Sequence, residues 1–246
     1  MEQKKESQSI QPISSTKENE ESLKEKTKKI SIREGASYGV MDGMGLRYVT
    51  PYALHLGASN AQIGFLTSIP TLIGNFLQMF TSKAIEKYSR KKILLLGVFM
   101  QTLMWIPLIG AGFLFFYGKL DSISSSNLVV LIYSLIIIFG AFVAPTWNSL
   151  MRDIVAKNIG TYFGKRNRIV GAFVILSLLL GSLILDYFKK TKIFWGFIII
   201  FGIAFLARAT SWFLLRKHYE PELKLQKGYY FSFRQFVSKI PQSNFG

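Results

Sequence analysis

Three ionisable side chains occur within stretches of sequence that are otherwise almost free of charge: Asp42, Arg47 and Arg208. If these stretches cross a membrane, each charge costs about 2.5–3.5 kcal/mol near the bilayer centre, so it must be paired or face a water-filled cavity. Asp42 and Arg208 lie at similar depth from the same end of their stretches, which predicts an intramembrane ion pair. That pair could bind substrate or only stabilise the helices.

Arg47 has no acidic residue at its own depth in the sequence. It is therefore the first candidate to bind an anionic group of a substrate. The alternative is an arginine that donates to backbone carbonyls or extends to the membrane surface.

Uncharged polar side chains are spaced along the same stretches so that they share helical faces. Asn75 and Gln78 are three residues apart, a spacing that puts two side chains on one face of a helix. Each polar group could form a hydrogen bond between helices, worth about 0.6–2 kcal/mol, or line a central cavity. The candidates for substrate binding are Arg47, Asn75, Gln78, Gln101, Trp147 and Asn148.

The sequence carries no motif of a soluble enzyme. It has no cysteine, which excludes thiolate metal sites and cysteine catalysis. Its two histidines, His55 and His218, are too far apart to predict a zinc site. Gly43 and Gly45 form a G-x-G, but Tyr48 stands where a dinucleotide-binding loop needs its third glycine. We expect no enzymatic activity, no cofactor and no metal site.

Six apolar stretches must position these polar groups. A membrane-spanning helix needs about 20 mostly apolar residues, and long runs without Asp, Glu, Lys or Arg recur along the chain. A soluble protein with six such helices and short connections would have no polar surface left for water. We therefore predict an all-α polytopic membrane protein with helices at 36–56, 61–82, 93–117, 127–152, 164–186 and 193–215.

The distribution of charge predicts the orientation of the bundle. The net charge is +16, and the basic residues concentrate before the first predicted span, in the second and fourth connections, and after the sixth span. The other connections hold few. Because basic loops stay in the cytoplasm, both termini are expected there, in a multi-pass protein of the cell membrane. The excess charge then faces anionic lipids, and nucleic acid is not an expected partner.

The tail 1–35 contains nearly equal numbers of acidic and basic side chains and almost no aromatic ones, so we expect it to be disordered. The next residues carry Gly35, Gly39 and Gly43 at a spacing of four. Glycines at this spacing make a smooth strip on a helix and predict close approach to a neighbour.

The segment SKAIEKYSRKK, from Ser82 to Lys92, resembles the signature loop of the major facilitator superfamily. In that frame Glu86 and Lys87 keep the acidic and basic positions, and Arg90 and Lys91 match the final basic pair. Both glycines of the pattern are replaced by serine. The loop falls between the second and third predicted spans, where the family has it. The segment 152–168, RDIVAKNIGTYFGKRNR, also resembles the family's turn between its fourth and fifth helices.

The resemblance implies half of a twelve-helix fold, built as a 3+3 inverted repeat. EKYSRKKI at 86–93 and DYFKKTKI at 186–193 resemble each other at an offset of 100 residues, as such a repeat predicts. The chain would then be an amino-terminal half, and we expect a second six-helix half as its partner. The segment 216–246 resembles the linker between halves, with an interfacial amphipathic helix in its aromatic part.

The function implied is secondary active transport of a small molecule by alternating access, with a proton or a sodium ion as the possible coupling ion. Asp42 is the only acid well inside a predicted span and hence the expected proton carrier of this half. The resemblance also implies a cytoplasmic latch, a set of side chains that would pair in one conformation and separate in the other without contacting substrate. Its members are Glu86, Lys87, Arg90, Lys91 and Asp153. The alternatives are a non-transporting structural or receptor-like bundle, a lipid-handling membrane protein, and a self-associating six-helix protein.

Overall fold

The computed structural model describes residues 13–189 and 192–222, which form helices without a strand. The predicted interfacial helix lies outside this part of the chain. The helices are α1 (Ile13–Met44), the 3-10 helix η1 (Leu46–Tyr48), α2 (Val49–His55), α3 (Asn60–Gln78), α4 (Thr81–Lys87), α5 (Arg90–Phe116), α6 (Ser122–Val155), α7 (Ile159–Phe188) and α8 (Ile193–Leu215).

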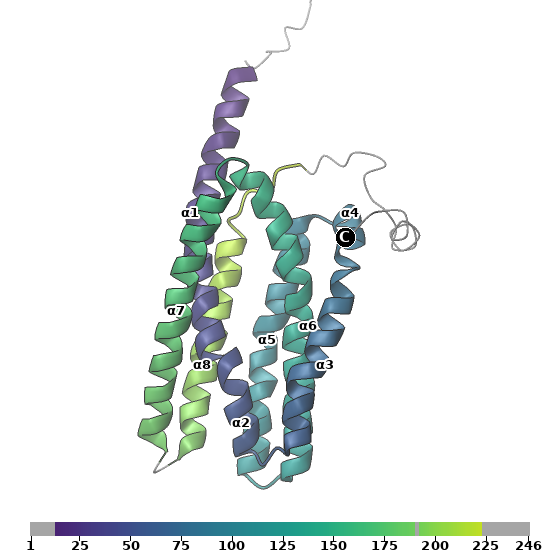
Figure 1. The fold of residues 1–246 in the computed structure, drawn as a ribbon, viewed down its shortest axis with the longest axis vertical. Helices are drawn as coiled ribbons and strands as arrows, with labels where there is room; N and C mark the ends of the chain where they lie inside the picture. Colours follow the sequence, from purple (N-terminus) through teal and green to yellow (C-terminus); the bar gives the residue numbers. More distant parts are fainter. Residues whose placement is uncertain (1–12, 190–191, 223–246) are drawn as a thin grey trace, which may run out of the picture.

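The long helices run side by side along one axis in two groups (Figure 1). In the first group α1 packs against α7 and α8, and in the second α6 packs against α3 and α5. Contact between α5 and α8 joins the groups. The α2–α3 and α5–α6 connections, the end of α7 and the start of α8 lie at one end of the bundle, and α4 and the α6–α7 connection lie at the other (Figure 1).

All six stretches predicted to span the membrane are helical, but only some of them qualify as spans on their own. Among the described residues, α5, α6, α7 and α8 are long and apolar enough to cross a membrane. The first predicted span is divided between α1 and α2, and the second, α3, has only 19 residues and includes several amides. Length and composition therefore support four of the six predicted spans.

The division of the first predicted span occurs at Gly45, between α1 and η1. A side chain at this position would collide with the indole of Trp105 and with the carbonyl oxygen of Met41. Pro51 follows in the first turn of α2, where a missing N–H breaks no helical hydrogen bond. The helix thus restarts after Gly45, and Pro51 costs it no backbone hydrogen bond.

The expectation of a disordered tail was wrong for residues 13–35, which belong to α1. Tertiary contacts explain the helix from Thr27 onward. Thr27, Ser31 and Glu34 are buried, the Tyr162 hydroxyl donates to the carbonyl of Lys28 at 3.2 Å, and the Tyr219 N–H donates to the Thr27 hydroxyl at 3.0 Å. The composition of this segment predicts disorder because it contains no record of these contacts with residues far away in the sequence.

The main core is aromatic and joins α2, α5 and α8. Tyr52, Trp105, Phe197 and Phe201 are buried, and the ring centroids of Tyr52 and Phe201 lie 5.0 Å apart. The Tyr52 hydroxyl donates to the carbonyl of Leu108 at 3.0 Å, so the one polar atom of that ring is satisfied. This core fixes α5 against α8 and so fixes the two groups of helices relative to each other.

The glycine strip of α1 makes the predicted close approach, and its partner is α7. A Cβ atom on Gly39 would lie 2.8 Å from the carbonyl oxygen of Val170. One on Gly43 would lie 2.8 Å from Cβ of Ser177 and closer still to the carbonyl oxygen of Val174. The two backbones leave no room for a methyl group.

We expect Gly43→Ala to destabilise the protein by about 1–3 kcal/mol, the usual cost of overpacking. The measurement is thermal unfolding of the purified protein in detergent. Gly171→Ala is the matched control, because a Cβ atom there would meet nothing within 4 Å. Equal unfolding midpoints for Gly43→Ala and the unsubstituted protein would show that α1 and α7 are not in close contact.

Candidate functional site

A cavity of about 490 Å³ lies between the two groups of helices, lined by residues of α1, α3, α5, α6, α7 and α8. Its lining includes the predicted candidates Asn75, Gln78, Gln101, Trp147 and Asn148. The structure therefore brings together side chains from α3, α5 and α6 that the sequence only placed on separate helices.

Arg47 does not line this cavity. Its side chain is 59% exposed, and its Nη2 lies 3.4 Å from Oδ2 of Asp42. In a continuous helix, residues five apart point in directions roughly 140° apart. The break at Gly45 removes that restriction and lets the two side chains meet. Arg47 thus has an acidic partner, contrary to the sequence analysis.

The wall on α3 and α6 carries amides that are free to bind a ligand. Asn75, Gln78 and Asn148 are exposed on the cavity, and their side-chain amides form no hydrogen bond with another described residue. Each amide offers two N–H donors and one carbonyl acceptor. These amides can therefore form hydrogen bonds with a polar molecule that binds in any of several orientations.

The facing wall contains a buried ion pair between α1 and α7. Nη2 of Arg166 donates to Oε2 of Glu34 at 2.9 Å, and Nε of Arg166 donates to the carbonyl of Ser31 at 3.3 Å. The guanidinium carbon of Arg166 also lies 4.0 Å from the ring centroid of Trp147, which is a cation–π distance. Trp147 therefore connects α6 to the ion pair on the opposite wall.

Arg208 extends this network to α5 and α8. Its Nη2 donates to Oε1 of Gln101, and its Nη1 donates to the Ser211 hydroxyl at 3.2 Å. The Ser211 hydroxyl in turn donates to Oε1 of Glu34 at 2.8 Å. The other end of Gln101 donates to the carbonyl of Ile136 on α6 at 2.7 Å. Gln101 is therefore both a lining residue and a bridge between three helices.

The predicted ion pair between Asp42 and Arg208 is not formed. Helices α1 and α8 are neighbours, as that prediction required. However, the guanidinium of Arg208 lies 5.4 Å from the ring centroid of Tyr38, one helical turn before Asp42. Arg208 thus faces Tyr38 and Glu34, and Asp42 pairs with Arg47.

Sequence reasoning missed Glu34 and Arg166, two of the charged residues of the cavity. Glu34 was assigned to the disordered tail, and Arg166 was counted among the basic residues that set the orientation. A usable signal existed, because Glu34 is the last acid before the glycine strip, and such a strip predicts a close neighbour for the residues around it.

Arg90 and Asp153, two residues predicted to belong to a cytoplasmic latch, are in contact at the end of the bundle that carries α4 (Figure 1). Arg90 is 1% exposed, and its Nη1 lies 2.5 Å from Oδ2 of Asp153 on α6. Its Nη2 donates to the carbonyl of Pro221 at 2.9 Å. The buried guanidinium therefore joins α5, α6 and the chain that follows α8.

Lys91 also binds the chain after α8, whereas Glu86 and Lys87 do not join these contacts. Nζ of Lys91 donates to the carbonyl of His218 at 2.8 Å. Lys87 lies near the ring of Tyr88, and Glu86 forms no ion pair with another described residue. The structure thus links Arg90, Lys91 and Asp153 of the predicted set.

The segment after α8, residues 216–222, is attached to α1 and α5 through further contacts. Glu220 accepts from the Ser89 hydroxyl at 2.6 Å and from the Lys91 N–H at 3.3 Å. The side chain of His218 is 2% exposed, and neither ring nitrogen has a hydrogen-bond partner among the described residues. Burial lowers the pKa of His218 to about 4, with the cations Lys91 and Arg166 adding to the effect and Glu34 opposing it.

Helices apolar enough to cross a membrane surround a polar, charged cavity, and this arrangement is that of a multi-pass membrane protein. Comparison with known families agrees: residues 37–241 match the family model of the Major Facilitator Superfamily. The chain therefore belongs to this superfamily of membrane transporters. No curated protein and no solved structure matches the chain. In the described part of the chain, no group of three or more His, Asp or Glu side chains could hold a metal ion.

We expect the stability of the protein to fall as the pH drops from about 6.5 toward 4. The unfolded chain takes up a proton at His218 over this range, whereas the folded protein does not, so protonation favours unfolding. The size of the pKa shift corresponds to roughly 3 kcal/mol. Thermal unfolding in detergent at a series of pH values measures the loss.

The test compares two histidine variants. His218→Phe should remove much of the loss of stability between pH 6.5 and 4, because it deletes the buried imidazole. His55→Phe should leave the pH profile unchanged, because His55 is exposed. Identical profiles for His218→Phe and the unsubstituted protein would contradict the role of His218.

Proposed function

We propose that the protein is a secondary active transporter that moves a small molecule across the cell membrane by alternating access, with the cavity as one half of the substrate path. The observation that carries the proposal is the location of the cavity between the two groups of helices, with polar residues from both groups in its walls. A cavity of a few hundred Å³ is of the size that binds small molecules.

The helix contacts support a 3+3 inverted repeat in which α1 corresponds to α6, α3 to α7, and α5 to α8. When each helix is replaced by its counterpart, the contact between α3 and α6 corresponds to the contact between α7 and α1. In the same way, the contact between α5 and α6 corresponds to the contact between α8 and α1. The contact of α5 with α8 maps onto itself. The segments 86–93 and 186–193 are similar in sequence, and the described helix ends that flank them lie at opposite ends of the bundle: α4 and the start of α5 at one, the end of α7 and the start of α8 at the other (Figure 1). We therefore infer that the α1–α2 unit and α3 also span the membrane.

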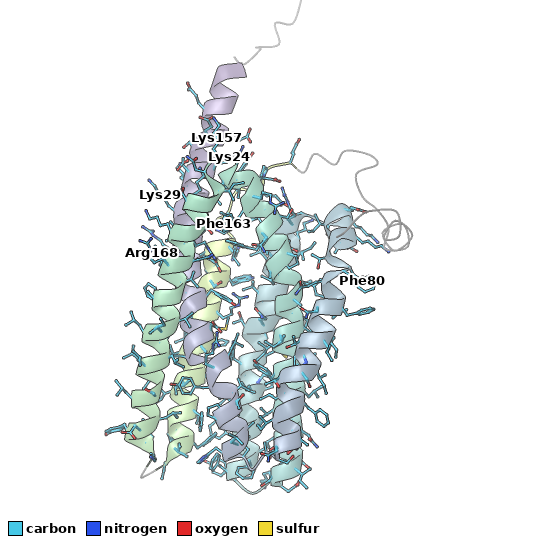
Figure 2. All side chains as sticks on the ribbon, in the orientation of Figure 1. Lys24, Lys29, Phe80, Lys157, Phe163 and Arg168 are labelled. Atoms are coloured by element: carbon cyan, nitrogen blue, oxygen red, sulfur yellow. The ribbon has the colours of Figure 1, made fainter. Side chains whose placement is uncertain are left out.

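The basic residues support an orientation with both termini in the cytoplasm. Lys24, Lys29, Lys157 and Arg168 all lie toward the end of the bundle from which α1 extends (Figure 2). In a cell membrane this end would face the cytoplasm and contact anionic lipids.

A second six-helix half would complete the substrate path. Helices α3 and α7 border the cavity and carry large exposed apolar side chains, among them Leu72 and Phe76 on α3 and Leu179 and Leu183 on α7. These faces suit contact with another bundle or with lipid. Alternating access then consists of a tilt of the two halves about the site.

A coupling proton or sodium ion would bind an acidic side chain of the path. Glu34 lines the cavity, whereas Asp42 does not. Glu34 therefore replaces Asp42 as the candidate for coupling in this half, and binding of the ion would have to break its bond with Arg166 or with Ser211.

The cytoplasmic latch would act on the rate of the conformational change. In this conformation Arg90 holds Asp153 and Pro221 together, and Lys91 holds His218. A conformation that separates α5 from α6 at this end would have to break these contacts, so they bias the equilibrium between the two states.

Transport is tested with the full-length protein in liposomes that carry a proton or sodium gradient. A panel of labelled organic anions, cations and neutral solutes is offered, and we expect at least one to accumulate until the gradient is dissipated. Asn148→Ala should reduce uptake of that solute about tenfold, whereas Arg47→Ala, outside the cavity, should leave it unchanged. Equal effects of both variants, or no gradient-dependent uptake, would contradict the proposal.

The latch is tested by the rate of transport rather than by binding. We expect Arg90→Ala to slow turnover about tenfold with little change in substrate affinity, because Arg90 contacts the chain after α8 and does not line the cavity. Lys87→Ala is the control, since Lys87 has no part in these contacts. Unaltered turnover in a folded Arg90→Ala variant would reject the latch.

A further inference from the structure

We propose that the substrate is a small organic anion whose carboxylate or phosphate group binds between Arg208 and Arg166. This inference rests on the proposed function and specifies the chemical class that the cavity accepts.

The charges of the cavity lining do not balance. Its ionisable acids and bases are Glu34, Arg166 and Arg208, so one carboxylate faces two guanidinium groups. Both oxygens of Glu34 are already occupied: Oε2 accepts from Arg166 at 2.9 Å, and Oε1 accepts from the Ser211 hydroxyl at 2.8 Å. The cavity therefore has one positive charge in excess.

The excess charge belongs to Arg208. Among the described residues, no carboxylate oxygen lies within 4.0 Å of its guanidinium, whose hydrogen-bond partners are the uncharged side chains of Gln101 and Ser211. The side chain is 2% exposed, and its Nε is buried without a partner. Glu34 attracts Arg208 across the Ser211 hydroxyl but forms its direct ion pair with Arg166, so two buried guanidinium groups share one carboxylate. An anion with strong hydrogen bonds to Arg208 would supply the missing negative charge.

Arg166 lies on the same wall and would add to the attraction. Its guanidinium is oriented from three sides by Glu34, the Ser31 carbonyl and the ring of Trp147. An arginine held in one orientation loses little entropy when it binds a ligand. Glu34 therefore both orients Arg166 and limits the positive charge of the site.

The rest of the cavity indicates that the anion is an organic molecule. A volume of about 490 Å³ far exceeds what a single inorganic ion fills. The lining also includes the apolar side chains of Ile137 and Phe163, and the free amides of Asn75, Gln78 and Asn148. A ligand that fits has an anionic group at one end and a body with apolar and hydrogen-bonding parts.

The first test uses the full-length protein in detergent and compares classes of probe by the shift in its unfolding temperature. The anionic probes are benzoate, succinate, inorganic phosphate and chloride, and the controls are glucose and tetramethylammonium. We expect an organic anion to raise the unfolding temperature and the neutral and cationic controls to leave it unchanged. A response to glucose or tetramethylammonium alone, or to chloride and phosphate alone, overturns the proposal.

The second test uses two variants with opposite expected effects on affinity. Arg208→Gln should weaken binding of the organic anion at least tenfold, because it removes the uncompensated charge. Glu34→Gln should strengthen binding severalfold, because it raises the positive charge of the site. A role of Glu34 as a structural partner of Arg166 alone would not strengthen binding.

Arg47→Gln is the matched control, since it removes a cation that does not line the cavity. Undiminished binding in a folded Arg208→Gln variant overturns the assignment. If that variant does not fold, the sign of the effect of Glu34→Gln decides, together with the class of probe that the unsubstituted protein binds.

Uptake of the same solutes into liposomes separates this inference from the proposed function. Gradient-driven uptake of cations or neutral solutes, without uptake of anions, keeps the transporter and rejects the anionic substrate. Binding of organic anions without uptake of any solute supports the site and rejects transport.

Discussion

The carboxylate of Glu34 is the centre of the polar network that joins α1, α7 and α8 on the charged wall of the cavity. It accepts hydrogen bonds from Arg166 on α7 and from Ser211 on α8. Arg208, also on α8, donates to Ser211 and to Gln101 on α5. Removing one partner of such a buried pair typically costs about 3–5 kcal/mol, because it leaves a charge without compensation. One acid thus joins three helices, and through Gln101 it reaches the second group.

This network gives the polar cavity its two different walls. On α1, α7 and α8 the charged groups are oriented by hydrogen bonds to neighbouring side chains and carbonyls, whereas the side-chain amides of Asn75, Gln78 and Asn148 have no hydrogen-bond partner among the described residues. A fixed charged wall can select a ligand by charge, and a wall of free amides can accept ligands of various shapes. The glycine strip of α1 belongs to the same arrangement, because close contact with α7 brings Glu34 to within hydrogen-bond distance of Arg166.

The sequence predicted the parts of the fold that depend on composition and period. The runs without charge located α5, α6, α7 and α8 to within a few residues, because a helix in hydrocarbon must be apolar along most of its length. Asn75, Gln78, Gln101, Trp147 and Asn148 meet in one cavity because a polar side chain at membrane depth has few other places to point. The loop with Arg90 and Lys91, and the later match of residues 37–241, led to the same family.

What the sequence did not predict depends on contacts between distant residues. Glu34 and Arg166 are 132 positions apart, and no local pattern records that they meet. Residues 13–35 are mostly polar, and the part of their helix around Thr27 and Lys28 is held by α7 and by the chain after α8. The break at Gly45 directs Arg47 toward Asp42, and Arg208 donates hydrogen bonds to Gln101 and Ser211 instead of pairing with Asp42.

If the protein works as proposed, water reaches the cavity between the two groups of helices within the membrane. Because the protein has no cysteine, one cysteine can be introduced at a time and treated with a membrane-impermeant thiol reagent in liposomes. Asn148→Cys, in the cavity, should react, and Ile106→Cys, exposed on the outside of α5, should remain unmodified in the lipid. Labelling of Ile106→Cys with no labelling of Asn148→Cys would contradict the account.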